Sequence, residues 1–143
     1  MHKNTLDLDN ASVDKWIAHW RKGGLVALPT ETVYGLAADA EQAHAVASIY
    51  ALKDRPRFNP LIVHVATTAS AMRYARWSDI AQQLAEVFWP GPLTMILPRH
   101  AQCPASDLVS AGGDTIALRV PAHPLAQCML QAFGRGVAAP SAN

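Results

Sequence analysis

The run Leu61-Ile62-Val63-His64-Val65 is almost continuously apolar and rich in β-branched residues. Such residues favour strands, and a strand that is apolar on both sides of its backbone has to be covered on both faces of its sheet. Helices commonly provide that cover. The run therefore predicts a layered fold with a central sheet.

The rest of the chain alternates between helical and strand patterns. Apolar residues recur at helical spacing from Val13 to Trp20, and Gly23-Gly24 ends that helix. Further strands are expected at 25–28, 33–37, 93–97, 115–120 and 137–139, and further helices at 41–52, 69–74, 80–88 and 124–133. This alternation of strands with helices predicts an α/β fold built in layers.

Length and composition limit the classes of protein to consider. The chain has 143 residues, so we expect a single domain spanning residues 1–143. Because 12 Lys and Arg residues nearly balance 11 Asp and Glu residues, no overall basic field indicates binding to nucleic acid or membrane. No apolar segment approaches the roughly 20 residues that span a bilayer, and the N-terminus lacks the apolar core of a signal peptide, so we expect a cytoplasmic protein. Neither the two cysteines nor the histidines show the spacing of a protein-bound metal.

A polar octet, Pro-Thr-Glu-Thr-Val-Tyr-Gly-Leu at 29–36, directly follows the apolar run at 25–28. It places hydrogen-bonding side chains at the end of a strand, where ligand sites are often built. The same residues can also form a capped turn without a ligand, because threonines and carboxylates stabilise turns. The octet by itself leaves both interpretations open.

The segment 53–60 carries Lys53, Arg55 and Arg57 between two prolines and cannot continue a helix. Prolines reduce the entropy that a loop loses when it is held in one geometry, so these cations are candidates for binding an anion. Forked guanidinium groups and a point charge together suit a polyphosphate. The alternative is a solvated loop whose charges only keep the protein soluble.

Polar residues also interrupt or follow other strands. His64 interrupts the apolar run at 61–65, either as a core histidine with its hydrogen bonds satisfied or as a ligand contact. Arg119 lies near the end of the strand at 115–120, where its guanidinium can bind a carboxylate or form a surface ion pair. Ser141 and Asn143 follow the last expected strand and either contact a ligand or form a turn.

Five motifs occur in a distinctive order along the chain. They are Pro-Thr-Glu-Thr-Val-Tyr-Gly-Leu at 29–36, Lys-Asp-Arg-Pro-Arg-Phe-Asn-Pro-Leu at 53–61, Trp-Pro-Gly-Pro-Leu-Thr at 89–94, Ala-Leu-Arg-Val-Pro at 117–121 and Ala-Pro-Ser-Ala-Asn at 139–143. Together they resemble the YrdC-like family of threonylcarbamoyl-AMP synthases over almost the whole chain. The resemblance implies a three-layer α/β fold, in which helices flank a twisted mixed β-sheet around a concave, locally positive ligand cavity.

The resemblance also implies an activity. Members of the family make threonylcarbamoyl-AMP and pyrophosphate from L-threonine, bicarbonate and ATP, for the N6-threonylcarbamoyladenosine modification of tRNA position 37. The implied partners are these three substrates, with tRNA or tRNA-modification proteins taking up the product. By motif, the implied threonine contacts are Thr32, His64 and Arg119. The implied nucleotide contacts are Lys53, Arg55, Asn59, Thr115, Ser141 and Asn143.

The chemistry of this reaction fits the residues found. A carbamate formed from threonine and bicarbonate attacks the α-phosphorus of ATP, so the protein has to hold two anions together and neutralise the developing charge. Lys53 and Arg55 are the candidates for that catalytic role, with a Mg²⁺ ion expected on the phosphates. No nucleophilic side chain is needed, which agrees with the lack of a Ser-His-Asp or Cys-His pattern in the sequence.

The chain departs from the family pattern after Asn143. In the family, further strands and helices follow the last motif, so we expect the YrdC-like domain to be incomplete at its C-terminus. Two other functions of the same fold stay open. One is an RNA-binding module without catalysis, which the near-neutral net charge disfavours. The other is a carbamoyl-adenylate-forming domain of the hydrogenase-maturation type, which the threonine-rich octet and Asn59 disfavour.

Overall fold

The structure is a computed structural model and describes residues 10–54, 56 and 59–140. The elements expected from the sequence are present, with boundaries that differ by a few residues, and a short 3-10 helix, η1, is added. In chain order they are α1 (Asn10–Arg21), β1 (Val26–Pro29), β2 (Tyr34–Asp39), α2 (Ala43–Leu52), β3 (Ile62–His64), α3 (Thr68–Ala71), α4 (Asp79–Phe88), β4 (Met95–Pro98), η1 (Asp107–Ser110), β5 (Thr115–Arg119), α5 (Pro124–Phe133) and β6 (Val137–Ala139).

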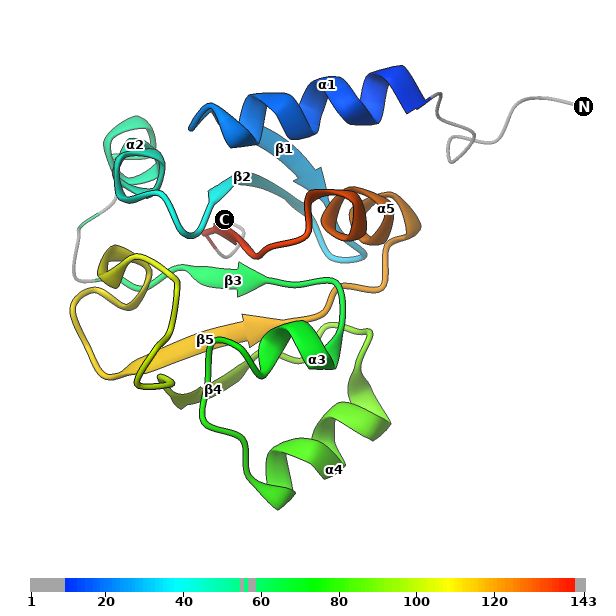
Figure 1. Cartoon of the computed structure of the whole chain (residues 1–143), viewed down its shortest axis with the longest axis vertical. Coiled ribbons are helices and arrows are strands. Elements are labelled where there is room, and N and C mark those ends of the chain that lie inside the picture. The colour runs from blue at the N-terminus through cyan, green and yellow to red at the C-terminus, as the bar shows by residue number, and fades with distance from the viewer. Residues whose placement is uncertain (1–9, 55, 57–58, 141–143) are drawn as a thin grey trace, which may run out of the picture.

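The six strands form one sheet in the order β1-β2-β6-β3-β5-β4 (Figure 1). Strands β3 and β5 are parallel, and every other neighbouring pair is antiparallel. The predicted mixed sheet of an α/β fold is therefore confirmed. Strand β6 lies in the middle of the sheet, between β2 and β3.

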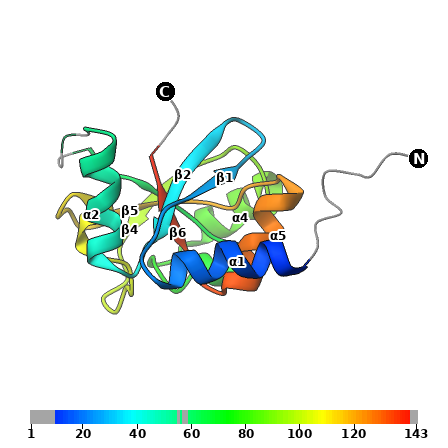
Figure 2. The ribbon, with the colours of Figure 1, turned by 90° about the horizontal axis from the view of Figure 1, so that it is seen from above.

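Helices cover both faces of the sheet, as the apolar run at 61–65 predicts. On one face α1 and α5 lie side by side (Figure 2), and Trp20 packs against Phe133 with ring centroids 5.1 Å apart. On the other face α2 and α4 pack against β3 and β5. Neighbouring residues of β2 divide between the two cores, because side chains alternate along a strand: Ala37 faces α1 and α5, and Ala38 faces α2.

Local signals set the ends of the helices around the sheet. Helix α5 begins with Pro124 in its first turn and with the ring of His123 accepting a hydrogen bond from the Leu125 N–H. It ends at Gly134, whose φ of 83° is readily available only to glycine. The signals at His123 and Pro124 set the connection from β5 to α5, and Gly134 begins the connection from α5 to β6.

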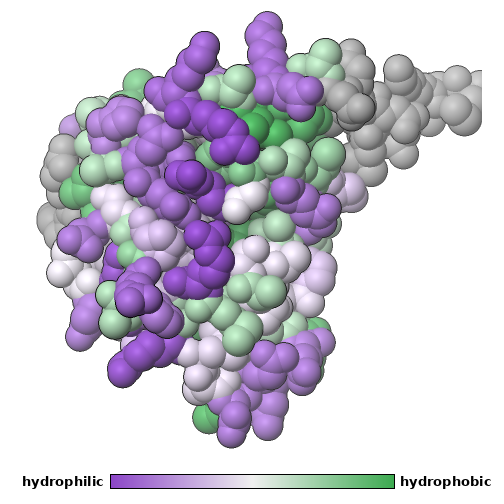
Figure 3. All heavy atoms as spheres, in the orientation of Figure 1, coloured by the Kyte–Doolittle hydropathy of each residue, from purple (hydrophilic) through white to green (hydrophobic). Residues whose placement is uncertain are grey.

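Polar side chains cover most of the face seen in Figure 3, and apolar residues gather where α1 meets α5. None of the helices formed by the described residues has the length and apolar character needed to cross a membrane.

Candidate functional site

The ends of two parallel strands bring His64 and Arg119 together. The register pairs His64 of β3 with Arg119 of β5. Their neighbours Val63 and Leu118 point into the core under α2 and α4, so His64 and Arg119 point to the opposite face. Both residues are nevertheless buried, with 4% and 6% of their surface exposed. Charged and polar groups are seldom buried without a partner, so these two residues define the site.

Three segments of the chain converge on the guanidinium of Arg119. Its Nε donates to the carbonyl of Gly91 at 3.1 Å, and its Nη1 donates to the hydroxyl of Thr32 at 3.2 Å. Its Nη2 lies 2.7 Å from Oε1 of Glu31. The polar octet, the Trp-Pro-Gly-Pro connection and the Ala-Leu-Arg-Val-Pro motif therefore meet at one arginine.

The Nη2 nitrogen of Arg119 is incompletely paired. It forms a 2.7 Å ion pair with the Glu31 carboxylate but is not aligned for a regular hydrogen bond to it or to another acceptor among the described residues. Because Nη2 carries two N–H groups, it can donate to a further acceptor beside Glu31. An arginine held in this state is suited to an anionic ligand that supplies the missing acceptor.

Glu31 is ionised at neutral pH. Its partial burial alone would raise its pKa, but hydrogen bonds from its own N–H and that of Ala122, together with the charge of Arg119, lower the pKa below 4.5. Both carboxylate oxygens accept from the Ala122 N–H at 3.1 Å. The carboxylate thereby connects the β1–β2 turn with the segment between β5 and α5.

His64 is neutral at physiological pH. Burial and, second, the neighbouring charge of Arg119 lower its pKa from 6.5 to about 4, against the opposing effects of the Ile62 and Val137 carbonyls and of Glu31. Its Nδ1 lies 3.1 Å from the Ile62 carbonyl, which can only accept, so Nδ1 carries the proton of the neutral ring. The site therefore contains one buried cation, one carboxylate and an uncharged imidazole.

The octet forms a capped turn that also presents Thr32 to Arg119. The Thr30 N–H donates to the Val33 carbonyl at 3.0 Å, and the Thr30 hydroxyl accepts from the N–H groups of Thr32 and Val33. The Thr30 and Thr32 hydroxyls are 3.0 Å apart. The two interpretations of the octet are thus compatible, because Thr30 stabilises the turn that positions Thr32.

A cavity of about 270 Å³ adjoins this cluster. It opens on the face of the sheet to which His64 and Arg119 point. Its walls mix hydroxyl groups, an imidazole and a guanidinium with apolar side chains: Leu28, Thr30, Thr32, Val33, Gly35, Ile62, His64, Thr94, Arg119, Ala139 and Pro140.

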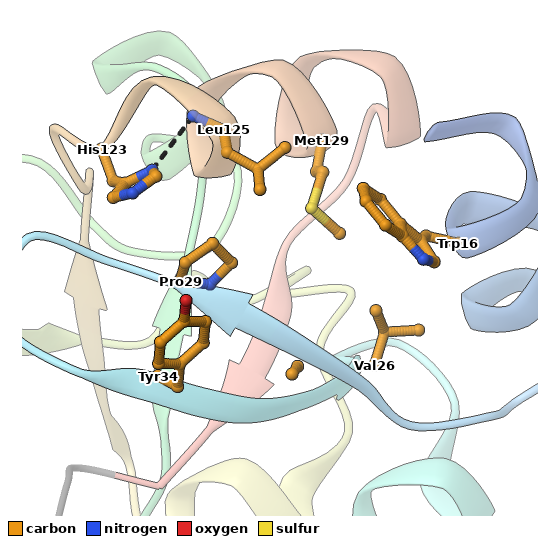
Figure 4. A pocket seen from close by; sticks show the side chains of 8 residues that line it. Trp16, Val26, Pro29, Tyr34, His123, Leu125 and Met129 are labelled. Atoms are coloured by element: carbon orange, nitrogen blue, oxygen red, sulfur yellow. Dashed lines mark hydrogen bonds between the residues drawn. The ribbon is translucent and has the colours of Figure 1, made fainter. Parts of the chain in front are cut away.

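A larger cavity of about 380 Å³ lies beyond the edge strand β1, against α1 and α5 (Figure 4). Trp16, Pro29, Tyr34 and Met129 point into it, and its lining among the described residues includes no Lys, Arg, Asp or Glu side chain. An apolar space of this kind offers no counter-charge to a carboxylate or a phosphate. The smaller cavity beside Arg119 is therefore the candidate site.

The residues predicted for threonine binding come together, whereas those predicted for nucleotide binding are dispersed or not described. Thr32, His64 and Arg119 all line the cavity of about 270 Å³. Lys53 caps the C-terminus of α2 and is exposed, and the carbonyl of Asn59 accepts from the Tyr50 hydroxyl at 2.9 Å. Thr115 is exposed at the start of β5, the opposite end of the strand from Arg119. The predicted residues Arg55, Ser141 and Asn143, and Arg57 of the cationic loop, lie outside the described residues.

Three residues of the site were not singled out from the sequence. Glu31 was considered only together with the threonines of the octet, as a turn or a binding segment, and Gly91 and Thr94 only as members of the motif at 89–94. For Arg119, the alternative of a surface ion pair is wrong, because its side chain is only 7% exposed. The position of Glu31 between two threonines was the available signal, since an isolated carboxylate in a ligand-binding motif needs a cationic partner when it is buried.

Comparison with known proteins gives a consistent result. The Sua5/YciO/YrdC family model, described as telomere recombination, matches residues 18–143. The chain is 46% identical over 124 residues to the threonylcarbamoyl-AMP synthase of Pyrococcus abyssi, covering 86% of this chain and 36% of that protein. It is 42% identical over 139 residues to the threonylcarbamoyl-AMP synthase of Bacillus subtilis, covering 96% and 40%. The chain therefore spans well under half the length of these two relatives.

A solved structure of P. abyssi Sua5 in complex with L-threonine has the same fold. It superimposes with a TM-score of 0.89 at 41% identity, covering 95% of this chain and 40% of that one. The likeness confirms the three-layer architecture of the family for this chain.

Proposed function

Since the chain belongs to the Sua5/YciO/YrdC family, we propose that it acts as a threonylcarbamoyl-AMP synthase. The reaction joins L-threonine, bicarbonate and ATP and releases pyrophosphate. The threonylcarbamoyl group is then available to the proteins that modify adenosine 37 of tRNA. Relatives named threonylcarbamoyl-AMP synthase at 46% and 42% identity support this assignment over the carbamoyl-adenylate alternative.

The observation that carries the proposal is the incompletely paired guanidinium of Arg119 beside a polar cavity. A substrate carboxylate provides the acceptor that Nη2 lacks. The Thr32 hydroxyl and the His64 imidazole line the same cavity, which suits the hydroxyl of a threonine side chain. A neutral His64 also avoids placing a second cation beside Arg119.

In the proposed reaction the chain positions anions and neutralises charge. Arg119 holds the threonine carboxylate, which leaves the amine free to react with bicarbonate. The carbamate so formed attacks the α-phosphorus of ATP, the bond from that phosphorus to the bridging oxygen breaks, and pyrophosphate leaves. Lys53 and Arg55 are the proposed cations for the phosphates. No group of three His, Cys, Asp or Glu side chains among the described residues is arranged to hold a metal ion, so we propose that Mg²⁺ arrives on the ATP phosphates as part of the substrate.

Pyrophosphate release by the 143-residue chain tests the proposal. We expect release that requires threonine, bicarbonate and ATP together, with binding of L-threonine measurable by calorimetry. Omission of each substrate in turn is the control. If carbamoyl phosphate replaces threonine and bicarbonate as the co-substrate, the carbamoyl-adenylate alternative is correct. If the chain neither binds threonine nor releases pyrophosphate, the proposal fails.

A further inference from the structure

We propose that Glu31 is a positioning residue, which holds the guanidinium of Arg119 in the orientation that receives the carboxylate of the amino-acid substrate. The inference rests on the proposed function, because it concerns how the threonine site is built. Glu31 lies next to the reacting groups without forming part of the cavity wall. It acts through Arg119.

Glu31 contacts Arg119 without being one of the residues that line the cavity. Thr32 and Arg119 line the cavity beside the site, and Glu31 does not. Its Oε1 is 2.7 Å from Nη2 of Arg119, and the side chains of the two residues are 27% and 7% exposed. A carboxylate in this position does not compete with a ligand for the cavity. It supports the guanidinium through the contact with Nη2.

Three contacts together determine the plane of the Arg119 guanidinium. Gly91 fixes Nε and Thr32 fixes Nη1, each through one hydrogen bond. These two contacts are neutral acceptors, so they leave the positive charge of Arg119 uncompensated. Glu31 supplies the third contact and is the carboxylate paired with Arg119 among the described residues. A buried guanidinium without its carboxylate is drawn toward other acceptors or toward solvent.

Glu31 is itself held from a second direction. Both of its oxygens accept from the N–H of Ala122, which lies 91 residues away in the sequence. The β1–β2 turn and the β5–α5 connection are therefore joined through one carboxylate at the point where Arg119 leaves β5. Because Arg119 contacts Glu31 and Thr32 at one end of this link, a change at Glu31 is expected to alter the position of its charged head.

The test measures threonine affinity in matched variants of the 143-residue chain. Glu31→Gln keeps the size of the side chain and removes its charge, and we expect the Kd for L-threonine to rise about tenfold. The KM for ATP should stay within about twofold, since Glu31 touches none of the proposed nucleotide contacts that the structure describes. Glu31→Asp keeps the charge and should recover part of the lost affinity. Glu41→Gln is the control, because Glu41 is also a carboxylate paired with an arginine but lies in a different cluster, 3.6 Å from Nη1 of Arg135.

The ¹⁵N–¹H signal of the Arg119 Nε group gives a second measurement that needs no ligand. It is assigned by its loss in Arg119→Lys, and in the wild type it should be protected by the bond to Gly91. In Glu31→Gln we expect faster exchange of this proton with solvent. Unchanged exchange together with unchanged threonine affinity would overturn the positioning role while leaving the proposed function intact. Wild-type protein that does not bind threonine would overturn both.

Discussion

Two of the arginine–carboxylate clusters among the described residues, those of Arg119 and Arg135, are completed to different extents. In one, Arg119 and Glu31 meet beside a cavity at the end of β5, and Nη2 of Arg119 has no hydrogen-bond acceptor among the described residues. In the other, Arg135 pairs with Asp39 at 3.2 Å and with Glu41 at 3.6 Å. The same chemical groups thus form one incomplete site and one closed network.

The second cluster satisfies its buried carboxylate fully within the protein. Asp39 is completely buried and accepts from the Glu41 N–H at 2.9 Å and from the side chain of Gln42 at 2.8 Å. Tyr74 donates to Glu41 at 2.8 Å and accepts from the Gly136 N–H at the same distance. Burial and the neighbouring Glu41 raise the pKa of the Tyr74 hydroxyl, which therefore remains a donor. This network joins the end of β2 to the segment before β6.

The difference between the clusters indicates how each contributes to the protein. A closed polar network stabilises one conformation, because every member would lose a partner on unfolding or rearrangement. An incomplete cluster is less stable than it would be with one more acceptor, and it gains that acceptor when an anion binds. Mutations in the closed network around Arg135 should therefore reduce stability, and mutations in the incomplete cluster around Arg119 should reduce ligand affinity.

The largest effect is expected at Asp39. Asp39→Ala removes the buried acceptor for the Glu41 N–H, for Gln42 and for Arg135, and leaves these partly buried donors without it. We expect the free energy of unfolding to fall by about 3 kcal/mol. Urea unfolding monitored by tryptophan fluorescence measures it. Under conditions where the Asp39→Ala protein is fully folded, it should bind threonine as the wild type does. A large loss of threonine affinity under those conditions would contradict the assignment of stability to one cluster and of ligand binding to the other.

The next effect is expected at Arg119. Arg119→Lys keeps the positive charge but loses the forked guanidinium, which contacts Gly91 and Thr32 and can at the same time receive the carboxylate of the substrate. We expect the Kd for L-threonine to rise about 100-fold, which is roughly 2.7 kcal/mol. Calorimetry measures the affinity, and Arg135→Lys is the matched control, with its threonine Kd within about twofold of the wild type. Equal losses in the two lysine variants would show that the clusters are not functionally distinct.

The elements of this fold could be predicted from local patterns, but the polar clusters could not. The apolar run at 61–65 and the helical spacing from Val13 to Trp20 depend on neighbours in the sequence, and they predicted β3 and α1 closely. The 3-10 helix at 107–110 is too short to show a helical period, so it was missed. Short irregular elements of this kind are set by their tertiary surroundings.

The partners of Arg119 depend on tertiary structure alone. The register of β3 with β5 decides that His64 lies beside Arg119, and the sequence does not state that register. The contact with Glu31 requires the β1–β2 turn to reach the end of β5. The motif resemblance gave Thr32, His64 and Arg119 as a group, but it did not identify Glu31 as the residue that compensates the charge.

The smallest effect is the pH dependence that His64, beside Arg119, gives to the free energy of unfolding. His64 has a pKa of about 4 in the folded protein and an ordinary value of 6.5 when unfolded. As the pH falls below 6.5 the unfolded chain binds a proton that the folded protein does not, so His64 makes the free energy of unfolding decrease until the pH reaches about 4. Between about pH 7.5 and 5.5 this amounts to about 1 kcal/mol.

Comparison of the wild type with His64→Gln isolates this contribution, because the other histidines are common to both proteins. The wild type should lose about 1 kcal/mol more stability than the variant over that interval, as measured by urea unfolding at each pH. Glu31 does not contribute to the difference, since its pKa is lowered below 4.5 and it stays ionised throughout. Parallel pH dependences would mean that the folded protein accepts a proton on His64 beside Arg119. In that case the cluster would tolerate a second buried cation, and its missing acceptor would no longer be a sufficient reason for it to bind an anion.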